Sequence, residues 1–163
     1  MKIREGVFED WPAIKKIYIE GIETENATFE TVDTFKQEEE WFNAKIDGSI
    51  FVAEENETVT GWAALSAVSE RCVYSGVAEV SVYVASDRQG KGIGSVLLKK
   101  LIEFSESNNI WTLQAGIFPE NTASIKLHEK QGFRIVGIRE KLGKLKGKWR
   151  DAVLMERRSK TIF

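Results

Sequence analysis

The chain reads Gln89-Gly90-Lys91-Gly92-Ile93-Gly94-Ser95 a little past its midpoint. This stretch follows an alternating apolar run typical of a strand, and it precedes apolar residues at helical spacing. Its three glycines let the main chain turn where a side chain would clash, and they leave the amide N–H groups bare. The start of a helix adds unpaired N–H groups and a partial positive charge. The stretch therefore predicts a binding site for a phosphate or pyrophosphate group.

The spacing of these glycines excludes two common nucleotide-binding motifs. A dinucleotide fold needs G-x-G-x-x-G near a first strand, and a P-loop needs G-x-x-x-x-G-K-[ST]. What remains is Q-x-x-G-x-G, from Gln89 to Gly94. At this point a glycine-rich turn that binds no ligand stays open as the alternative.

Length and composition indicate one soluble domain over residues 1–163. Hydrophobic residues make up 42% of the chain and charged residues 29%, and the net charge is −2. Such a charge creates no field that attracts nucleic acid, and no apolar run is long enough to cross a bilayer. Cys72 is the only cysteine, so no internal disulfide forms, and we interpret it as a small residue that is at least half-buried. We expect a cytoplasmic protein with no nucleic-acid or membrane partner.

Apolar periodicity and turn residues predict a mixed α/β (α+β) fold. Hairpins come early and strand–helix–strand units come later, which favours a mixed sheet. We expect Asp10 to cap the first helix, a Thr34–Gln37 capping box to open the second, and a turn over Gly143–Gly147. The expected strands are 2–5, 50–54, 59–68, 77–84, 111–117, 133–142 and 148–155, and the later helices are 93–104 and 121–131.

The strand before the glycine-rich stretch has two different faces. One face is apolar, with Val80, Val82 and Val84, and the other carries Glu79, Ser81 and Tyr83. A buried carboxylate is costly without a partner or a task, and desolvation would make the carboxylate a stronger base, which suits the role of a general base. The alternative is a glutamate on an exposed face.

A second polar segment begins at Asn121, which is a natural helix N-cap. The helix that follows contains His128, the only histidine of the chain. Histidine is the side chain whose ordinary pKa lies nearest neutrality, so it is a candidate for proton transfer. A lone helical histidine with a purely structural role is the alternative.

Together these segments resemble the GNAT acetyltransferase superfamily, and most closely its phosphinothricin and methionine-sulfoximine branch. The resemblance covers nearly the whole chain, with the motifs in the family's order. They are Phe29-Glu30-Thr31 ahead of Trp41-Phe42, Arg71 to Val84, Arg88 to Gly94, Asn121 to Phe133, and Gly147-Lys148-Trp149-Arg150-Asp151.

The resemblance implies a GNAT-like acyl-CoA N-acyltransferase fold, a mixed and splayed sheet flanked by helices. Acetyl-CoA would lie in the gap at the strand that precedes the glycine-rich stretch, with its pyrophosphate on the amides of that stretch. No metal is expected. The implied cofactor-binding residues are Val82, Tyr83, Val84, Gln89, Gly90, Lys91, Gly92, Ile93, Gly94, Ser95 and Asn121.

The resemblance also implies the chemistry and the substrate. Glu79 would deprotonate a primary amine, which attacks the thioester directly, while a main-chain N–H meets the oxyanion. His128 is an acid, a base relay or a structural group. Arg71 and Phe29 would bind the substrate with Glu79, since a guanidinium suits a carboxylate or phosphinate, although a surface Arg71 and a loop-anchoring Phe29 remain open. Cys72 stands where this branch often has proline, so the Arg71 loop has its own geometry.

Three functions follow from these residues. The first is an acetyltransferase for a small amino acid or analogue, such as phosphinothricin, methionine sulfoximine or methionine sulfone. The second is a GNAT enzyme that acetylates protein N-termini or lysines, and the third is a non-catalytic acyl-CoA-binding module. The family branch implies a homodimer.

Overall fold

The computed structural model describes residues 1–163, which form seven strands and four α-helices. Three short 3-10 turns, Phe8–Asp10, Cys72–Tyr74 and Ser86–Arg88, join them. The elements are β1 (Lys2–Glu5), α1 (Trp11–Glu23), α2 (Glu38–Asn43), β2 (Phe51–Glu55), β3 (Thr58–Ala67), β4 (Val77–Val84), α3 (Ile93–Ser107), β5 (Thr112–Ile117), α4 (Thr122–Lys130), β6 (Arg134–Leu145) and β7 (Lys148–Arg158).

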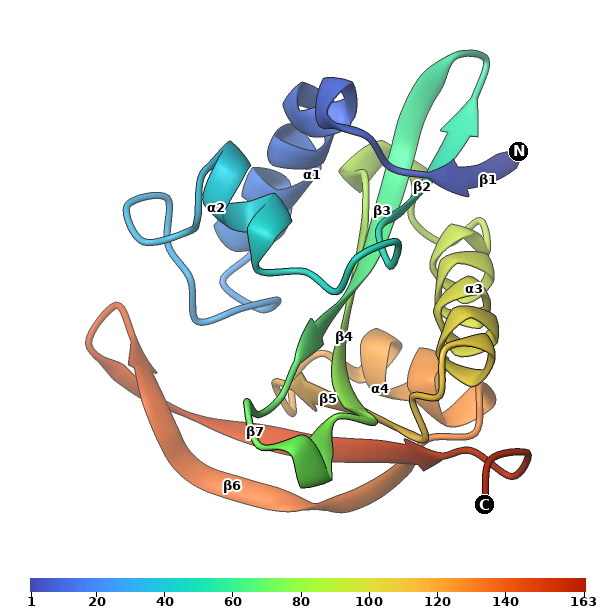
Figure 1. Ribbon diagram of the computed structural model, residues 1–163. Coiled ribbons are helices and arrows are strands. Elements are labelled where there is room, and N and C mark those ends of the chain that lie inside the picture. The colour runs from blue at the N-terminus through green and yellow to red at the C-terminus, as the bar shows by residue number, and fades with distance from the viewer.

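All seven strands belong to one sheet, in the order β1-β2-β3-β4-β5-β7-β6. Every neighbouring pair is antiparallel except β4 and β5, which are parallel and are joined through α3. Helices α1 and α2 lie on one side of the sheet and α3 on the other, while the long β6–β7 hairpin curves across one end (Figure 1). The predicted mixed sheet flanked by helices is confirmed.

The sheet splits between β4 and β5. Only three residue pairs join these strands, and the last of them is Glu79 with Gln114. Beyond that pair β4 continues beside β3, whereas β5 continues beside β7. The two halves of the sheet therefore diverge from Val80 onward.

Two separate cores fix the two faces of β4. On one face Val80, Val82 and Val84 join the core that contains Leu97 and Leu101 of α3. On the other face Tyr83 packs against the core of α1, α2 and β3. The alternation expected for this strand is thus confirmed for its apolar face. Each face of β4 is anchored by its own layer of helices.

The predicted start of the second helix is wrong. Thr34 lies in a turn, where its hydroxyl donates to Glu30 Oε2 and accepts from the Thr31 N–H, at 2.8 Å each. The helix α2 begins at Glu38, after Gln37. Asp10 does stand at the N-cap of α1, but its carboxylate accepts from Arg4 and from the Val7 N–H, each at 2.8 Å. In both places a partner outside the helix outcompetes the local cap.

The final hairpin turns later than expected. Lys146 and Gly147 have φ of 49° and 78° and form a two-residue turn, so β6 runs through Gly143 to Leu145. A two-residue loop with two positive φ values suits the twist of a hairpin. Gly143 is needed for packing instead, because a Cβ there would lie 3.2 Å from Phe29 Cε1.

Candidate active site

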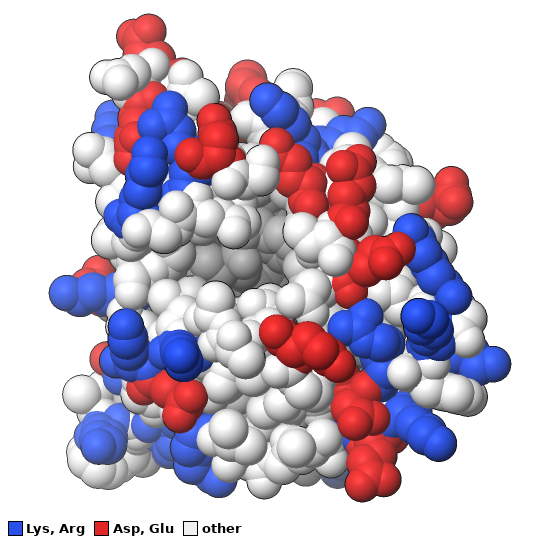
Figure 2. Space-filling model, turned by 180° about the vertical axis from the view of Figure 1, so that it is seen from behind, with Lys and Arg blue, Asp and Glu red and all other residues white.

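A cavity of about 420 Å³ occupies the split between β4 and β5. Its walls come from the 27–30 loop, β4, β5, the start of α4, β6 and β7. Figure 2 shows one face of the molecule hollowed near its centre, with mainly uncharged residues in the hollow and charged side chains around it. The size and the mixture of apolar walls with a few polar groups are those of a small-molecule site.

The β4 edge of the split carries main-chain groups without a strand partner. Ala85 donates its N–H to the Thr60 carbonyl at 2.8 Å, so the main-chain groups of Ala85 point toward β3. Along an antiparallel strand these groups point alternately toward and away from the partner, so those of Val82 and Val84 point away from β3. No residue of β5 pairs with them. The Gln89 side chain reaches one of these groups, the Val84 carbonyl, at 3.5 Å. The edge is open to an extended ligand that bonds like an added strand.

The glycine-rich stretch lies beyond the cavity wall and opens α3. Gly90 and Gly92 have φ of 77° and 82°, the left-handed region that favours glycine, and no heavy atom lies within 4 Å of a Cβ built on either. Gly92 is the N-cap of α3 and forms no side-chain cap bond. The first amides of α3 are therefore free to bind an anion, and the space in front of them is clear.

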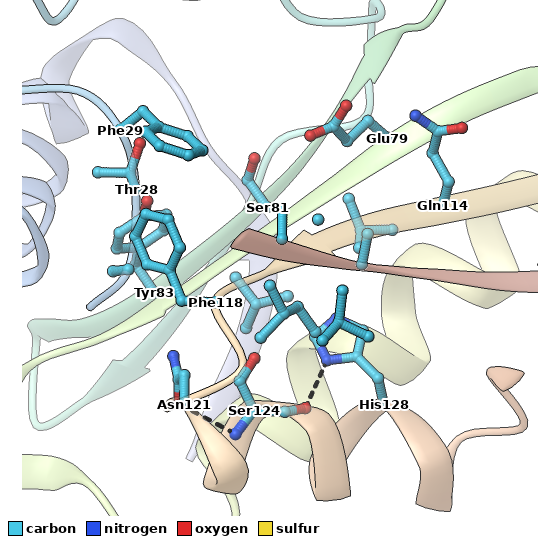
Figure 3. Close-up of a pocket in the computed structure, with 18 of the residues that line it drawn as sticks. Thr28, Phe29, Glu79, Ser81, Tyr83, Gln114, Phe118, Asn121, Ser124 and His128 are labelled. Carbon is cyan, nitrogen blue, oxygen red and sulfur yellow. Dashed lines mark hydrogen bonds between the residues drawn. The ribbon is translucent and has the colours of Figure 1, made fainter. Parts of the chain in front are cut away.

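The other face of β4 presents Glu79, Ser81 and Tyr83 to the cavity, as the alternation predicted (Figure 3). Glu79 is exposed, so the desolvation expected for its carboxyl is absent. Tyr83 stacks on Trp62 at a centroid distance of 4.7 Å, and burial raises its pKa. The phenol therefore stays protonated at neutral pH.

Phe29 forms part of the cavity wall and also anchors its loop. Its ring meets Phe118 edge-on, with centroids 4.8 Å apart, and Figure 3 shows Thr28 and Phe29 on the same side of the cavity as Tyr83. Gly143 of β6 lies against the same ring. The two interpretations of Phe29 that the sequence left open are thus compatible.

The helix α4 brings Asn121 and His128 to the cavity. The Asn121 side chain accepts the Ser124 N–H at 3.2 Å, which confirms the predicted N-cap, and donates to the Asn26 carbonyl. His128 is only 4% exposed, and its Nδ1 lies 2.7 Å from the Ser124 carbonyl (Figure 3). A carbonyl only accepts, so Nδ1 carries the proton and Nε2 carries the lone pair in the neutral ring.

Burial lowers the pKa of His128, and the bond to the Ser124 carbonyl offsets this only in part. We predict that the ring is neutral at pH 7 and that its NMR titration midpoint lies below 6.5. As the pH falls below 6.5 the unfolded chain binds the proton more readily, so this residue destabilises the fold in acid. The histidine is unique in the chain, so its ring signals need no assignment by mutation. A midpoint above 6.5 would contradict this prediction.

Arg71 lies outside the cavity wall. It is exposed, and its guanidinium lies 5.5 Å from the ring centroid of Tyr74 in the turn between β3 and β4. Its neighbour Cys72 is exposed, so the expectation that Cys72 is buried is wrong. The 3-10 turn over Cys72–Tyr74 directs these side chains to the surface. The structure thus brings Glu79, Phe29, Asn121 and His128 together, but not Arg71.

Comparison with known proteins places this chain in a family. The acetyltransferase (GNAT) domain family matches residues 3–154. The chain belongs to the GNAT acetyltransferases. Its sheet, with a single parallel pair that splits beyond Glu79, is therefore the fold of an acetyl-transferring enzyme.

Three relatives of this GNAT chain are informative. A methionine sulfoximine/methionine sulfone acetyltransferase of Pseudomonas paraeruginosa is 33% identical, over 94% of this chain and 92% of its own. A Sinorhizobium meliloti phosphinothricin acetyltransferase solved with acetyl-CoA is 31% identical, with a TM-score of 0.86 over 96% of this chain and 87% of that one. A Brucella melitensis ribosomal-protein-alanine N-acetyltransferase is 34% identical, with a TM-score of 0.90 over 98% and 100%.

Several polar residues of the GNAT cavity were not predicted as site residues from the sequence, and among them are three with long side chains. They are Lys45 after α2, Gln114 on β5 and Arg139 on β6. Gln114 pairs with Glu79 across the last rung before the split. Lys45 and Arg139 belong to no motif, and only the three-dimensional path of the chain brings them to β4. Strand alternation along β6 could have predicted that Arg139 faces the cavity. That prediction requires the pairing register of β6 with β7, which the sequence does not give.

Proposed function

We propose that this acetyltransferase moves the acetyl group of acetyl-CoA to the α-amine of a small amino acid or analogue. The observation that carries the proposal is the split in the sheet. The open edge of β4 leads to the free amides at the start of α3, and the cavity that occupies the split contains Glu79. A donor and an acceptor approaching from opposite sides would meet at β4.

The donor side has groups suited to each part of acetyl-CoA. The open main chain of Val82 and Val84 would bond the pantetheine arm, and the amides from Gln89 to Ser95 would hold the pyrophosphate. Asn121, at the N-cap of α4, would reach the same ligand. Bound there, acetyl-CoA supplies an activated acetyl group that a neutral amine attacks directly. The clear space before Gly90 and Gly92 fits such a close approach.

Glu79 is the proposed base on the acceptor side. Its carboxylate is accessible from the cavity and forms no ion pair within the chain, so it is free to take a proton from an ammonium, directly or through water. A main-chain N–H of β4 would stabilise the oxyanion. The neutral ring of His128 has no proton on Nε2, so we propose that this nitrogen accepts or relays a proton. The proton for the leaving thiolate of coenzyme A would then come from the Tyr83 hydroxyl.

Acetylation of protein N-termini or lysines is the second candidate. The Brucella melitensis neighbour carries the name of an enzyme for ribosomal-protein alanine, and it is similar over the whole chain. A peptide needs an open groove, whereas Phe29 and Phe118 pack edge to face in the cavity wall. We therefore rank the free amino acid first.

Acetyl-CoA-dependent product formation, followed by mass spectrometry, tests the proposal. The panel contains phosphinothricin, methionine sulfoximine, methionine sulfone, the common amino acids, and peptides with alanine or other N-termini. We expect acetylated amino acids at rates well above those of the peptides. Acetylation of peptides alone would overturn the first candidate, and tight acetyl-CoA binding with no acceptor turned over would favour a non-catalytic module.

We further propose a cytoplasmic homodimer. The β6–β7 hairpin exposes several large apolar side chains, as surfaces that bind a protein partner do. They are Ile135, Val136, Ile138, Leu142 and Trp149. The single exposed thiol fits a reducing compartment. No helix is long and apolar enough to span a membrane. A mass of one chain, 18.5 kDa, in light scattering at assay concentration would contradict the dimer.

A further inference from the structure

Arg139 is a cation of the cavity wall without a partner in the chain. It lies on β6 opposite Ala152, and its side chain forms no ion pair and no hydrogen bond. The other arginines of this hairpin all bind oxygen atoms of the protein, namely Arg134, Arg150, Arg157 and Arg158. Arg139 is exposed and lines the cavity, so its unpaired guanidinium is accessible to an anion that enters there, and a bidentate bond to a carboxylate or phosphinate would suit it.

Lys45 is a second cation of the wall, on the other side of the cavity. Its Nζ lies 4.9 Å from the ring centroid of Trp41 and 3.4 Å from Ser66 Oγ, and no carboxylate pairs with it. Burial lowers its pKa to about 8, so most of it is still charged at neutral pH. Ser66 is the cross-strand partner of Glu79. The ammonium of Lys45 therefore stands beside the part of β4 that carries Glu79.

The cavity also has two carboxylates, and only one of them is without a partner. Glu30 accepts the Thr34 hydroxyl at 2.8 Å, within its own loop. Glu79 accepts no hydrogen bond and forms no ion pair. The groups left free are thus one anion and two cations. Their complement is a ligand with one ammonium group and two anionic groups.

We propose that this site, if it acetylates amino acids as proposed above, selects those whose side chain carries a second anionic group. Lys45 binds the α-carboxylate and Arg139 binds the side-chain anion. The α-amine and α-carboxylate share one carbon, so their partners must be neighbours, as Glu79 and Lys45 are. Arg139 lies on β6, two strands beyond β5, and lines the same cavity as Glu79 and Lys45.

Phosphinothricin and methionine sulfone form a matched pair of probes. They have the same length and nearly the same shape, but phosphinothricin has a phosphinate where methionine sulfone has a neutral sulfone. We expect the unmodified enzyme to show a kcat/KM at least ~10-fold higher for phosphinothricin, since a charge-assisted bidentate contact is worth about that much or more.

Two variants separate the roles of the cations. Arg139→Gln should lower kcat/KM for phosphinothricin by roughly 10- to 100-fold while changing that for methionine sulfone by less than about 3-fold. Lys45→Met should lower both values by a similar factor, because both substrates have the α-carboxylate. Arg139→Lys keeps the positive charge, so it should keep most of the preference for phosphinothricin over methionine sulfone. This result would show that the loss in Arg139→Gln comes from the missing charge and not from a folding defect.

Two control variants lie on β6, the strand of Arg139, but outside the cavity. Arg134→Gln removes another arginine of β6, and Lys144→Met removes a lysine whose Nζ lies 4.8 Å from the ring of Trp149. Both should leave kcat/KM for each of the two substrates, and therefore their ratio, unchanged. The inference is overturned if the unmodified enzyme prefers methionine sulfone, or if Arg139→Gln changes both substrates equally. If neither compound is acetylated while peptides are, the proposed function itself fails.

Discussion

Replacing Glu79 with glutamine is expected to lower kcat by roughly 10²- to 10⁴-fold, the range that a general base contributes. Glutamine keeps the shape of the side chain but accepts no proton, so the ammonium of the substrate stays charged and cannot attack. Glu79 lies on the acceptor face of β4, whereas the free main chain and the α3 amides are elsewhere. The dissociation constant of acetyl-CoA, measured by calorimetry, should therefore stay within about 2-fold.

The matched control for this variant is Glu30→Gln. Glu30 lines the same cavity, but it is already held by the Thr34 hydroxyl. We expect its loss to change kcat by only a few-fold. If Glu79→Gln turned over at the normal rate, or if Glu30→Gln were the more damaging change, Glu79 would not be the base.

The largest expected loss of stability follows the truncation of Trp62 to alanine. This side chain is 1% exposed, stacks on Tyr83, and meets Trp41 and Tyr18 with centroids 5.1 and 5.6 Å away. Removing it leaves a large cavity among rings that have no way to collapse together. We expect the free energy of unfolding to fall by about 3–5 kcal/mol, measured by urea denaturation.

Two further tryptophan variants test the reason for this loss. Trp62→Phe keeps a ring on Tyr83 and removes the buried Nε1, which has no hydrogen-bond partner, so it should cost less than half as much. At a concentration at which the chain is monomeric, Trp149→Ala removes a ring that is 56% exposed and should stay within about 0.5 kcal/mol of the unmodified chain. Equal losses for Trp62→Ala and Trp149→Ala would exclude burial as the cause.

The fold was predictable from the sequence because its signals are local. Alternating valines before the glycine-rich stretch and leucines at helical spacing after it identify β4 and α3, and both assignments are confirmed. The errors arose where a residue has another partner than the one that its motif predicts. Thr34 engages Glu30 and not the start of α2, and Gly143 packs against Phe29 and not in the turn.

The candidate site was predictable only where its residues sit on regular elements. Glu79 and His128 reach the cavity because strand alternation and helix register direct them there. Whether Glu79 is buried, and which ring nitrogen of His128 is protonated, depend on neighbours far away in sequence. Lys45 shows the limit most clearly, since its approach to β4 depends on the path of the whole segment between α2 and β2.

Because Cys72 is the one thiol of the chain and faces solvent, a maleimide dye would attach at a single known position without prior removal of other cysteines. That position adjoins Arg71, so the dye's emission would report on movement of the β3–β4 turn as ligands arrive. The same thiol would also add one equivalent of background colour per chain to any assay that follows coenzyme release with a disulfide reagent.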